Sequence, residues 1–474
     1  MVREMSNFRK ALVAVVFLAP STSLTLTPHS INTRNGPVGT LRLLRGASTN
    51  LHEGFNSGDD DNFIYDVAII GSGPASCSLA SLLTASSTSN GDDKAQASSP
   101  NVVVLSKYAD KRWIPNYGCW TEEWTVLHKL YSERGVPGLM ECGVDVEWKD
   151  TDCFFGEFDK DIFQNPNPES VCTEGSYRRT VGREYLRVSR TGLKKIFCGD
   201  NRKYDVIQED VLGTAKNVNV YLPGGSITFH DTYTELTLKE SKRKIKAKIV
   251  VDGTGAESPF TIRDNRDREG YQIAYGVECR VKGEGVTDTM VGDYDRSKMT
   301  LFDFRSEQWR EDKDLKSTVD DIIRQPTFNY VMPLSKDVIF FEETSLVANP
   351  AMSFQECKER LTARLKSQNV HITDILEEEF CYIPMGGGLP RKGQRIVPIG
   401  AASGLVHPST GYQVGRCLSS NLDVSEQILT ELRRSASPTE PPFDPDAAAA
   451  RIIGTIWTPE AIRRKYNFDN VSCK

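Results

Sequence analysis

Hydrophobic and polar residues follow two different patterns along this chain, and the difference predicts two kinds of β-sheet. Residues 65–70 and 101–105 are nearly continuous apolar runs, which are typical of parallel strands covered on both faces. The later strands are predicted in a second, largely antiparallel sheet and comprise residues 271–281, 299–304, 330–332 and 338–341. The chain is therefore expected to contain two sheets of different character.

Helical spacing of apolar residues recurs between and after these strands. Residues 183–197 predict one helix, and residues 353–367 predict an amphipathic helix with Ser353 as its N-cap. A long helix is predicted at residues 412–432. The stretch 435–450 is rich in Pro and Ala, and we expect it to be a linker.

Composition and charge limit the class of function. With 474 residues, the chain is long enough for two or three domains. The net charge is only -6, and no basic block is interleaved with aromatic residues, which argues against nucleic-acid binding. The 11 cysteines are scattered without a Cys-x-x-Cys pair, so we expect reduced thiols and no metal site.

The N-terminal segment has the composition of a targeting sequence. Basic residues precede the apolar run 11–19, which fits the hydrophobic region of a signal peptide. Residues 21–50 are rich in Ser and Thr, carry three Arg and contain no acid, as organelle transit peptides do. We interpret the two parts as a signal plus a plastid transit segment, with plain secretion as the alternative. No later segment is predicted to span a membrane.

A glycine-rich turn follows the first predicted strand and opens a helix. Gly71, Gly73 and Ser76 occupy the three positions of the dinucleotide-binding fingerprint, whose glycines permit a tight turn and close approach to a pyrophosphate. Ser76 departs from the usual Gly or Ala, and Ser106 stands where an acid would bind a ribose hydroxyl. We interpret this segment as a nucleotide-binding unit rather than a purely structural turn.

Two further glycine motifs are similar to motifs that contact FAD. Residues 251–255 resemble the second strand-end motif of flavoproteins with two dinucleotide domains. Residues 399–411 have the layout of a third motif, in which a Pro-x-x-Gly turn starts a helix whose N-terminal amides stabilise negative charge on the flavin. From these motifs we expect the following residues at the cofactor: Asp252, Gly253, Gly255, Gly400, Pro408 and Gly411.

These features together predict an α/β protein, with an FAD/NAD(P)-binding Rossmann-like domain and an inserted, largely antiparallel β-sheet substrate domain. The predicted divisions are a targeting segment at 1–52, a discontinuous FAD-binding domain at 62–125, 180–260 and 385–432, a substrate and catalytic domain at 261–384, and a linker with a short C-terminal segment at 433–474.

Two adjacent acids, Glu342 and Glu343, directly follow a run of strand-forming residues. Because side chains alternate along a strand, only one of them can face a given side of the sheet. The one that points into an apolar pocket would have a raised pKa and could act as a protonated general acid. The alternative is a pair of solvated turn acids. The sequence leaves open which of the two is the acid.

Several blocks in the same order resemble the lycopene cyclases of plants and algae, with most similarity to the β-type. Besides the glycine motifs, the resemblance rests on blocks at 115–120, 185–190, 270–276 and 326–333, and on Phe340-Phe341-Glu342-Glu343-Thr344, where the family carries its catalytic Phe-Leu-Glu-Glu-Thr. The similar region covers about residues 65–464.

The resemblance implies a carotenoid cyclase that acts without net oxidation or reduction. A glutamate, Glu342 or Glu343, would protonate the acyclic ψ-end of lycopene, and the resulting carbocation would close to a ring. Reduced FAD would stabilise positive charge, with NADPH as the reductant and Arg190 among the cofactor-binding residues. Lycopene or a related carotenoid and the plastid membrane surface are the implied partners. Both β- and ε-ring formation remain open.

Three alternatives to a carotenoid cyclase remain open. The first is a related carotenoid end-group isomerase that opens an epoxide by the same acid step. The second is an FAD-dependent monooxygenase or prenyl reductase on the same fold, against which Ala401 and Ala402 argue, because flavin hydroxylases usually carry Gly-Asp there. The third is a homologue without activity that binds a carotenoid or another cyclase.

Overall fold

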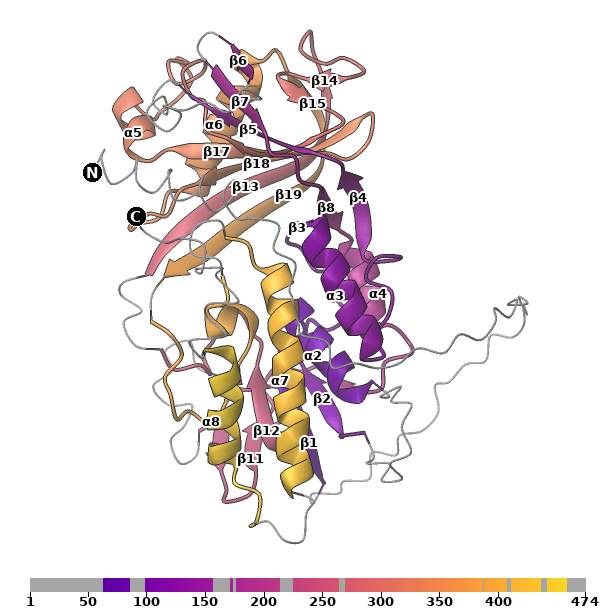
Figure 1. Ribbon diagram of the computed structural model, residues 1–474. Coiled ribbons are helices and arrows are strands. Elements are labelled where there is room, and N and C mark those ends of the chain that lie inside the picture. Colours follow the sequence, from indigo (N-terminus) through magenta and orange to yellow (C-terminus); the bar gives the residue numbers. More distant parts are fainter. Residues whose placement is uncertain are drawn as a thin grey trace, which may run out of the picture.

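The computed structural model describes residues 63–85, 99–156, 171–173, 176–213, 225–263, 269–386, 388–406, 411–435 and 441–457. The predicted targeting segment at 1–52 lies outside the described residues. The described chain forms two large sheets, one above the other in Figure 1, with a small third sheet beside their boundary.

The first sheet contains the two strands that the apolar runs predicted. Four of its strand pairs are parallel (β1 with β12 and with β2, β2 with β9, and β12 with β20), whereas β10 and β11 extend one edge in antiparallel fashion. In spatial order the strands are β10 (Ile227–Phe229), β11 (Thr234–Thr237), β12 (Lys244–Asp252), β1 (Ile64–Ile70), β2 (Val102–Leu105) and β9 (Asp205–Ile207), with β20 (Val397–Pro398) beside β12.

Three helices cover one face of this sheet (Figure 1). They are α2 (Pro74–Thr84), α7 (Val414–Ser435) and α8 (Pro445–Ile456). Ile69 from the sheet, Leu79 from α2 and Val424 from α7 belong to the shared core and have no exposed surface. Strands buried on both faces favour continuous apolar sequences, which explains why these strands could be predicted.

The second sheet has eight strands and carries the predicted acid pair on β18. In spatial order its strands are β19 (His371–Gly386), β13 (Glu269–Lys282), β18 (Val338–Ser345), β17 (Thr327–Pro333), β16 (Met299–Asp303), β5 (Thr151–Phe155), β7 (Ser176–Thr180) and β6 (Val171–Thr173). Helix α6 (Phe354–Ser367) packs Leu361 and Leu365 against one face, together with Ile339 and Phe341. The Ser353 side chain accepts a hydrogen bond from Glu356 N–H, which confirms the predicted N-cap.

A third sheet connects the two halves. Its strands are β3 (Tyr117–Trp120), β8 (Tyr185–Val188) and β4 (Val144–Trp148), flanked by α3 (Thr121–Glu133) and α4 (Arg190–Cys198). Trp120, Trp148 and Tyr185 pack against the face of the second sheet opposite α6, beside Phe340. Two smaller elements complete the description: the hairpin β14 (Met290–Val291) and β15 (Tyr294–Asp295), and α5 (Val319–Arg324).

Three segments differ from the prediction. Residues 183–197 form β8 and then α4, because Ser189 caps the helix and ends the strand. Residues 371–386 form the long edge strand β19, which the sequence did not predict. The second sheet also takes β5, β6 and β7 from residues outside the predicted 261–384 segment.

The predicted linker contains helix α8. Pro445 occupies the first helical turn, and the Asp444 side chain accepts hydrogen bonds from two backbone N–H groups. The alanine run 447–450 was predicted as part of a linker. Alanine is the strongest helix former, so the run favours the helix. Ile452 and Ile456 bury their side chains in the core of the first sheet.

Substituting Ile452→Ala should lower the free energy of unfolding by about 2–5 kcal/mol, because a fully buried side chain would leave a cavity. Thermal or chemical unfolding measures the change. Ala450→Ser on the exposed side of the same helix is the control and should have little effect. Equal stability of both variants would contradict the assignment of α8 to the core.

Candidate active site

The glycine motifs meet where the parallel strands β1 and β12 end. Gly71 follows β1 with φ of +97°, and a side chain there would lie 2.7 Å from the carbonyl oxygen of Gly253. The Gly253 N–H in turn donates to the carbonyl of Ile70 at 2.9 Å. Glycine is required at Gly71 because the Gly253 backbone touches it, and a side chain at Gly253 would lie 2.1 Å from the Ser76 hydroxyl oxygen. The first two predicted motifs are therefore parts of one surface.

The departure at Ser76 has a structural explanation. Ser76 is fully buried, and its hydroxyl donates to the Gly253 carbonyl at 3.4 Å, so that it joins α2 to the second motif. Gly73 caps α2 without a side-chain hydrogen bond, and no atom of the described residues lies within 4 Å of a side chain added there. The first turn of α2 carries no acid. An uncapped helix N-terminus reached through an open glycine suits an anionic group such as a pyrophosphate.

The Asp252 carboxylate is occupied by hydrogen bonds from residues that follow it in the chain. Its carboxylate is fully buried, accepts hydrogen bonds from the backbone N–H of Thr254 at 3.0 Å and from the Ser258 hydroxyl at 2.5 Å, and is also bonded by Thr261. These contacts hold the loop that contains Gly255, whose φ of +97° and open surroundings leave its backbone accessible.

The third motif lies beside the other two. Gly400 has φ of +57°, and a side chain there would lie 2.9 Å from Ala75 Cβ in α2. Gly411 has φ of +70° three residues before α7 begins, and a side chain there would lie 2.9 Å from Gln272 Oε1. Gln272 is 1% exposed, and among the described residues neither its Nε2 nor its Oε1 has a hydrogen-bond partner. Pro408 lies outside the described residues.

Arg190, which the sequence predicted at the cofactor, lies at the boundary of the two sheets. Its two terminal nitrogens donate to the two carboxylate oxygens of Glu377 on β19, each at 2.9 Å. A neighbouring arginine, Arg187 on β8, donates to Glu278 on β13 at 2.7 Å. Arg187 therefore joins the third sheet, and Arg190 joins α4, to the second sheet by charge-assisted hydrogen bonds.

The two predicted acids point to opposite faces of β18, as strand alternation requires. Glu343 shares its face with Ile339 and Phe341, which pack against α6. Glu342 shares its face with Phe340, which packs against Tyr185 and the third sheet. The structure thus separates the acids between the covered side of the sheet and the side that faces the rest of the molecule.

Glu343 is held in a compensated ion pair. It is fully buried, and the Arg364 guanidinium on α6 donates to both carboxylate oxygens at 2.9 Å. The Thr327 hydroxyl donates to it as well. Arg364 also lies 3.6 Å from Asp303, and burial alone would raise the pKa of Asp303, but Arg305 and Arg364 lower it. Glu343 therefore belongs to a buried charge cluster whose charges are matched.

Glu342 is in a different environment. It is half-buried, and its one hydrogen bond in the described structure comes from the Thr344 hydroxyl at 2.8 Å. Burial raises the pKa of Glu342 to about 8, and the negative charge of Glu379 adds to the rise. Tyr330 lies directly opposite on β17 and donates its hydroxyl to Tyr185 at 3.2 Å. This acid is therefore protonated at neutral pH beside aromatic rings.

Sequence reasoning missed Glu379 and the groups that bind it. Glu379 lies on β19, and its carboxylate accepts hydrogen bonds from the Asn116 backbone N–H and the Cys381 thiol, both at 2.9 Å. Asn116 and Arg187 occur within the blocks that carry the family resemblance, which was a usable signal. Glu379 itself is the last of three consecutive acids, and nothing local distinguishes it from its neighbours.

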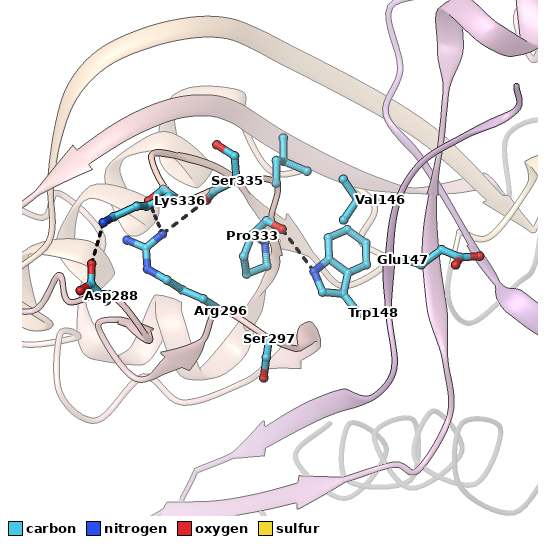
Figure 2. Close-up of a pocket in the computed structure, with 10 residues that line it drawn as sticks. Val146, Glu147, Trp148, Asp288, Arg296, Ser297, Pro333, Ser335 and Lys336 are labelled. Atoms are coloured by element: carbon cyan, nitrogen blue, oxygen red, sulfur yellow. Dashed lines mark hydrogen bonds and ion pairs between the residues drawn. The ribbon is translucent and has the colours of Figure 1, made fainter.

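A separate surface pocket of about 470 Å³ lies at the end of β17 beside β4 (Figure 2). Its lining includes Trp148, which donates to the Pro333 carbonyl at 3.2 Å, and Lys336, which pairs with Asp288 at 3.0 Å. Neither the glycine motifs nor the acid pair contribute to the lining. Because Lys336 pairs with Asp288 and Arg296 donates to backbone carbonyls such as that of Lys336 at 2.7 Å, we assign no chemistry to this pocket.

Comparison with known proteins connects this geometry to a family. A family model described as lycopene cyclase protein matches residues 66–469. A chloroplastic neoxanthin synthase from Solanum lycopersicum is 32% identical over 371 residues, which are 78% of this chain and 61% of the relative. A chloroplastic lycopene beta cyclase from Arabidopsis thaliana is 29% identical over 405 residues, 85% of this chain and 68% of the relative. The chain thus spans 61% of the length of the first relative.

Solved structures resemble this chain in fold only. A geranylgeranyl bacteriochlorophyll reductase-like protein from Thermoplasma acidophilum aligns with a TM-score of 0.50 and 12% identity, covering 86% of this chain and 85% of that one. Together with the parallel sheet and its glycine loops, this confirms the predicted Rossmann-like fold with an inserted, largely antiparallel sheet.

The two acids should respond differently to removal of their charge. Glu343→Gln leaves Arg364 buried without its carboxylate, and we expect a loss of about 3–5 kcal/mol in the free energy of unfolding. Glu342→Gln should instead gain stability at high pH. Between pH 4.5 and about 8 the folded wild type binds a proton that the unfolded chain does not, so its stability falls as pH rises.

Thermal unfolding of both variants at pH 5, 7 and 9 measures these effects. The Glu342→Gln variant should match the wild type at pH 5 and melt several degrees higher at pH 9. The Glu343→Gln variant should melt lower at every pH. Equal pH dependence of the wild type and Glu342→Gln would contradict the raised pKa.

Proposed function

The chain belongs to the lycopene cyclase family, and we propose that it is a carotenoid cyclase that closes the acyclic ψ-end of lycopene to a ring, without net oxidation or reduction. The observation that carries the proposal is Glu342, a carboxyl without an ion-pair partner among the described residues, whose pKa is raised to about 8. An acid that stays protonated at neutral pH holds the proton that must be transferred to the alkene.

In this proposal Glu342, not Glu343, is the general acid. The Thr344 hydroxyl orients the Glu342 carboxyl by the hydrogen bond at 2.8 Å. Tyr330 and Tyr185 present aromatic rings on the same face, and ring faces attract a developing carbocation. Glu343 is paired with Arg364 and supports the strand from the opposite side.

The glycine surface fits a bound FAD. Gly71, Gly73 and the uncapped start of α2 would hold the pyrophosphate, and Gly400 and Gly411 would lie along the rest of the cofactor. The buried Gln272 amide, with no partner among the described residues, suits a polar group of that ligand. When bound and reduced, FAD would supply negative charge near the carbocation. NADPH as its reductant is proposed from the family resemblance.

A second candidate is isomerisation of an oxygenated carotenoid end group by the same acid. The 32% identity to a neoxanthin synthase supports it, because that relative is as similar to this chain as the cyclases are. Incubation with lycopene and with an epoxycarotenoid, followed by product analysis, separates the two. We also propose a plastid location, supported by the chloroplastic relatives and the predicted transit segment.

Membrane contact is proposed at the edge strand β19. Within the described residues, no helix is long and apolar enough to cross a bilayer. Ile375, Leu376 and Tyr382 on β19 are nevertheless about half exposed, at 52%, 47% and 49%. Clusters of exposed apolar side chains favour contact with lipid or protein. Since β19 also carries Glu379, a carotenoid that leaves the bilayer here would arrive near Glu342.

The variant Glu342→Gln should lower cyclisation at least ~100-fold, since it removes the transferable proton but keeps the shape. Colour and pigment analysis in lycopene-producing bacteria measures this. Wild-type turnover in vitro should fall above about pH 8, where Glu342 loses its proton. The exposed Glu311→Gln variant is the control. Full activity of Glu342→Gln would overturn the assignment, and absence of cyclic product from the wild type would overturn the proposed reaction.

The double variant Ile375→Gln and Leu376→Gln should bind phosphatidylcholine vesicles about tenfold more weakly, because it removes apolar area from the contact. Vesicle flotation measures binding. Turnover should fall for lycopene presented in vesicles but not for lycopene in detergent. Val319→Gln, an exposed apolar residue on α5, is the control. Unchanged flotation of the double variant would contradict contact through β19.

A further inference from the structure

We propose that Glu379 on β19 is the base that completes the cyclisation, acting with Glu342 as a pair of carboxyls on either side of Gly276. The proposal rests on the proposed function and adds a second catalytic residue to it. It assigns the two proton transfers of the reaction to two different side chains.

The strand register brings the two carboxyls to one face. Glu342 pairs directly with Gly276 on β13, and Glu379 pairs with the same Gly276 from the other side. Residues opposite one another on neighbouring strands share a face, and two strand spacings separate their backbones by roughly 10 Å. A side chain at Gly276 would lie 2.8 Å from the Phe340 ring and 3.3 Å from Glu379 Cβ. Glycine at this position therefore lets the Phe340 ring lie against β13 between the strands that carry the two carboxyls.

Charge compensation singles out these two acids from the others on the face. The same register places Glu278 and Glu377 beside them, and Arg187 and Arg190 bind those two carboxylates. Neither Glu342 nor Glu379 lies within ion-pair distance of a cation in the described ranges. A buried carboxyl without a matching cation is costly when charged, so the pair must hold a proton between them.

The hydrogen bonds divide the roles within the pair. Glu379 accepts from the Asn116 N–H and the Cys381 thiol, both of which favour its ionised form. Within the described ranges, Glu342 accepts one hydrogen bond, from the Thr344 hydroxyl. Burial raises the pKa of both groups, and the two donors oppose the rise at Glu379. Environments that push two carboxyl pKa values apart identify an acid and a base.

Other titratable and charged groups also face the pair. They come from every element packed against it and comprise Tyr117 on β3, Tyr185 and Arg187 on β8, Arg190 on α4, Glu278 on β13, Tyr330 on β17, and Glu377 and Cys381 on β19. Burial raises the pKa of the Tyr185 and Tyr330 hydroxyls, so both stay neutral. The arginines are engaged with Glu278 and Glu377.

The reaction then balances in protons and electrons. The O–H bond of Glu342 breaks and a C–H bond forms at the terminal alkene, which becomes a tertiary carbocation. The neighbouring alkene supplies the electron pair of the ring C–C bond, and the positive charge moves to a ring carbon. A C–H bond beside that carbon breaks, its electron pair forms the new double bond, and Glu379 takes the proton. Return of this proton from Glu379 to Glu342 resets the pair.

The test compares Glu379→Gln with the wild type on lycopene in D₂O, using the flavin-loaded protein. Loss of the base should lower cyclic product at least ~100-fold. Glu342 should still protonate the alkene reversibly, so the recovered acyclic substrate should carry deuterium at the protonated carbon. Glu342→Gln should give neither product nor deuterium. Mass spectrometry of recovered lycopene measures the difference, which a merely structural role of Glu379 would not produce.

Two further variants keep the test decisive. Glu378→Gln is the matched control, since this neighbour is exposed, points to the other face and binds Lys358 and Tyr275. Cys381→Ala removes one donor from Glu379, so the acid limb of the pH–rate profile should move to higher pH. Cys381→Ala tests the role of Glu379 even if the Glu379→Gln variant fails to fold.

The outcomes separate this proposal from the proposed function. Cyclisation by the wild type with undiminished activity in Glu379→Gln, or an unmoved acid limb in Cys381→Ala, would overturn the role of Glu379 alone. No cyclic product from the wild type would instead overturn the proposed reaction. Product loss with deuterium in the recovered substrate supports the pair.

Discussion

Charge compensation across one β-strand is the constraint on which the proposed chemistry depends. Strand alternation sends Glu343 to the α6 side, where Arg364 binds both of its oxygens at 2.9 Å. The same alternation sends Glu342 to the side where no cation binds it among the described residues. A buried carboxylate is tolerated when it is matched and is driven to its neutral form when it is not. One adjacent pair therefore contains a carboxyl held by an arginine and a carboxyl with a raised pKa.

The boundary between the two sheets extends this logic. Arg187 and Arg190 bind Glu278 and Glu377 and thereby hold the third sheet and α4 against the face that carries Glu342. The contacts that join the halves of the molecule also use up the cations of that face. Of the acids on this face, Glu342 and Glu379 are left without a cation among the described residues, on either side of β13. The same arginine–glutamate contacts therefore hold the elements together and leave Arg187 and Arg190 engaged with Glu278 and Glu377.

Local signals made a large part of this architecture predictable. The apolar runs of β1 and β2, the Ser353 cap of α6 and the glycine turns at Gly71 and Gly253 each depend on residues close in sequence. Strand β19 was missed because three consecutive acids disfavour a strand. It forms because partners distant in sequence, such as Arg190 and the Asn116 N–H, bind those acids. Helix α8 was missed because its Ala and Pro content also fits a linker.

The sequence by itself determined the alternation of Glu342 and Glu343, the glycine turns and the family resemblance, because each follows from the order of residues along the chain. Only the tertiary structure decided which acid is neutral and that Glu379 stands beside it. Both depend on groups at long sequence separation, Arg364 on α6 for one and Gly276 on β13 for the other. The pKa of a carboxyl is set by burial and by nearby charge, and neither is defined until the chain has folded.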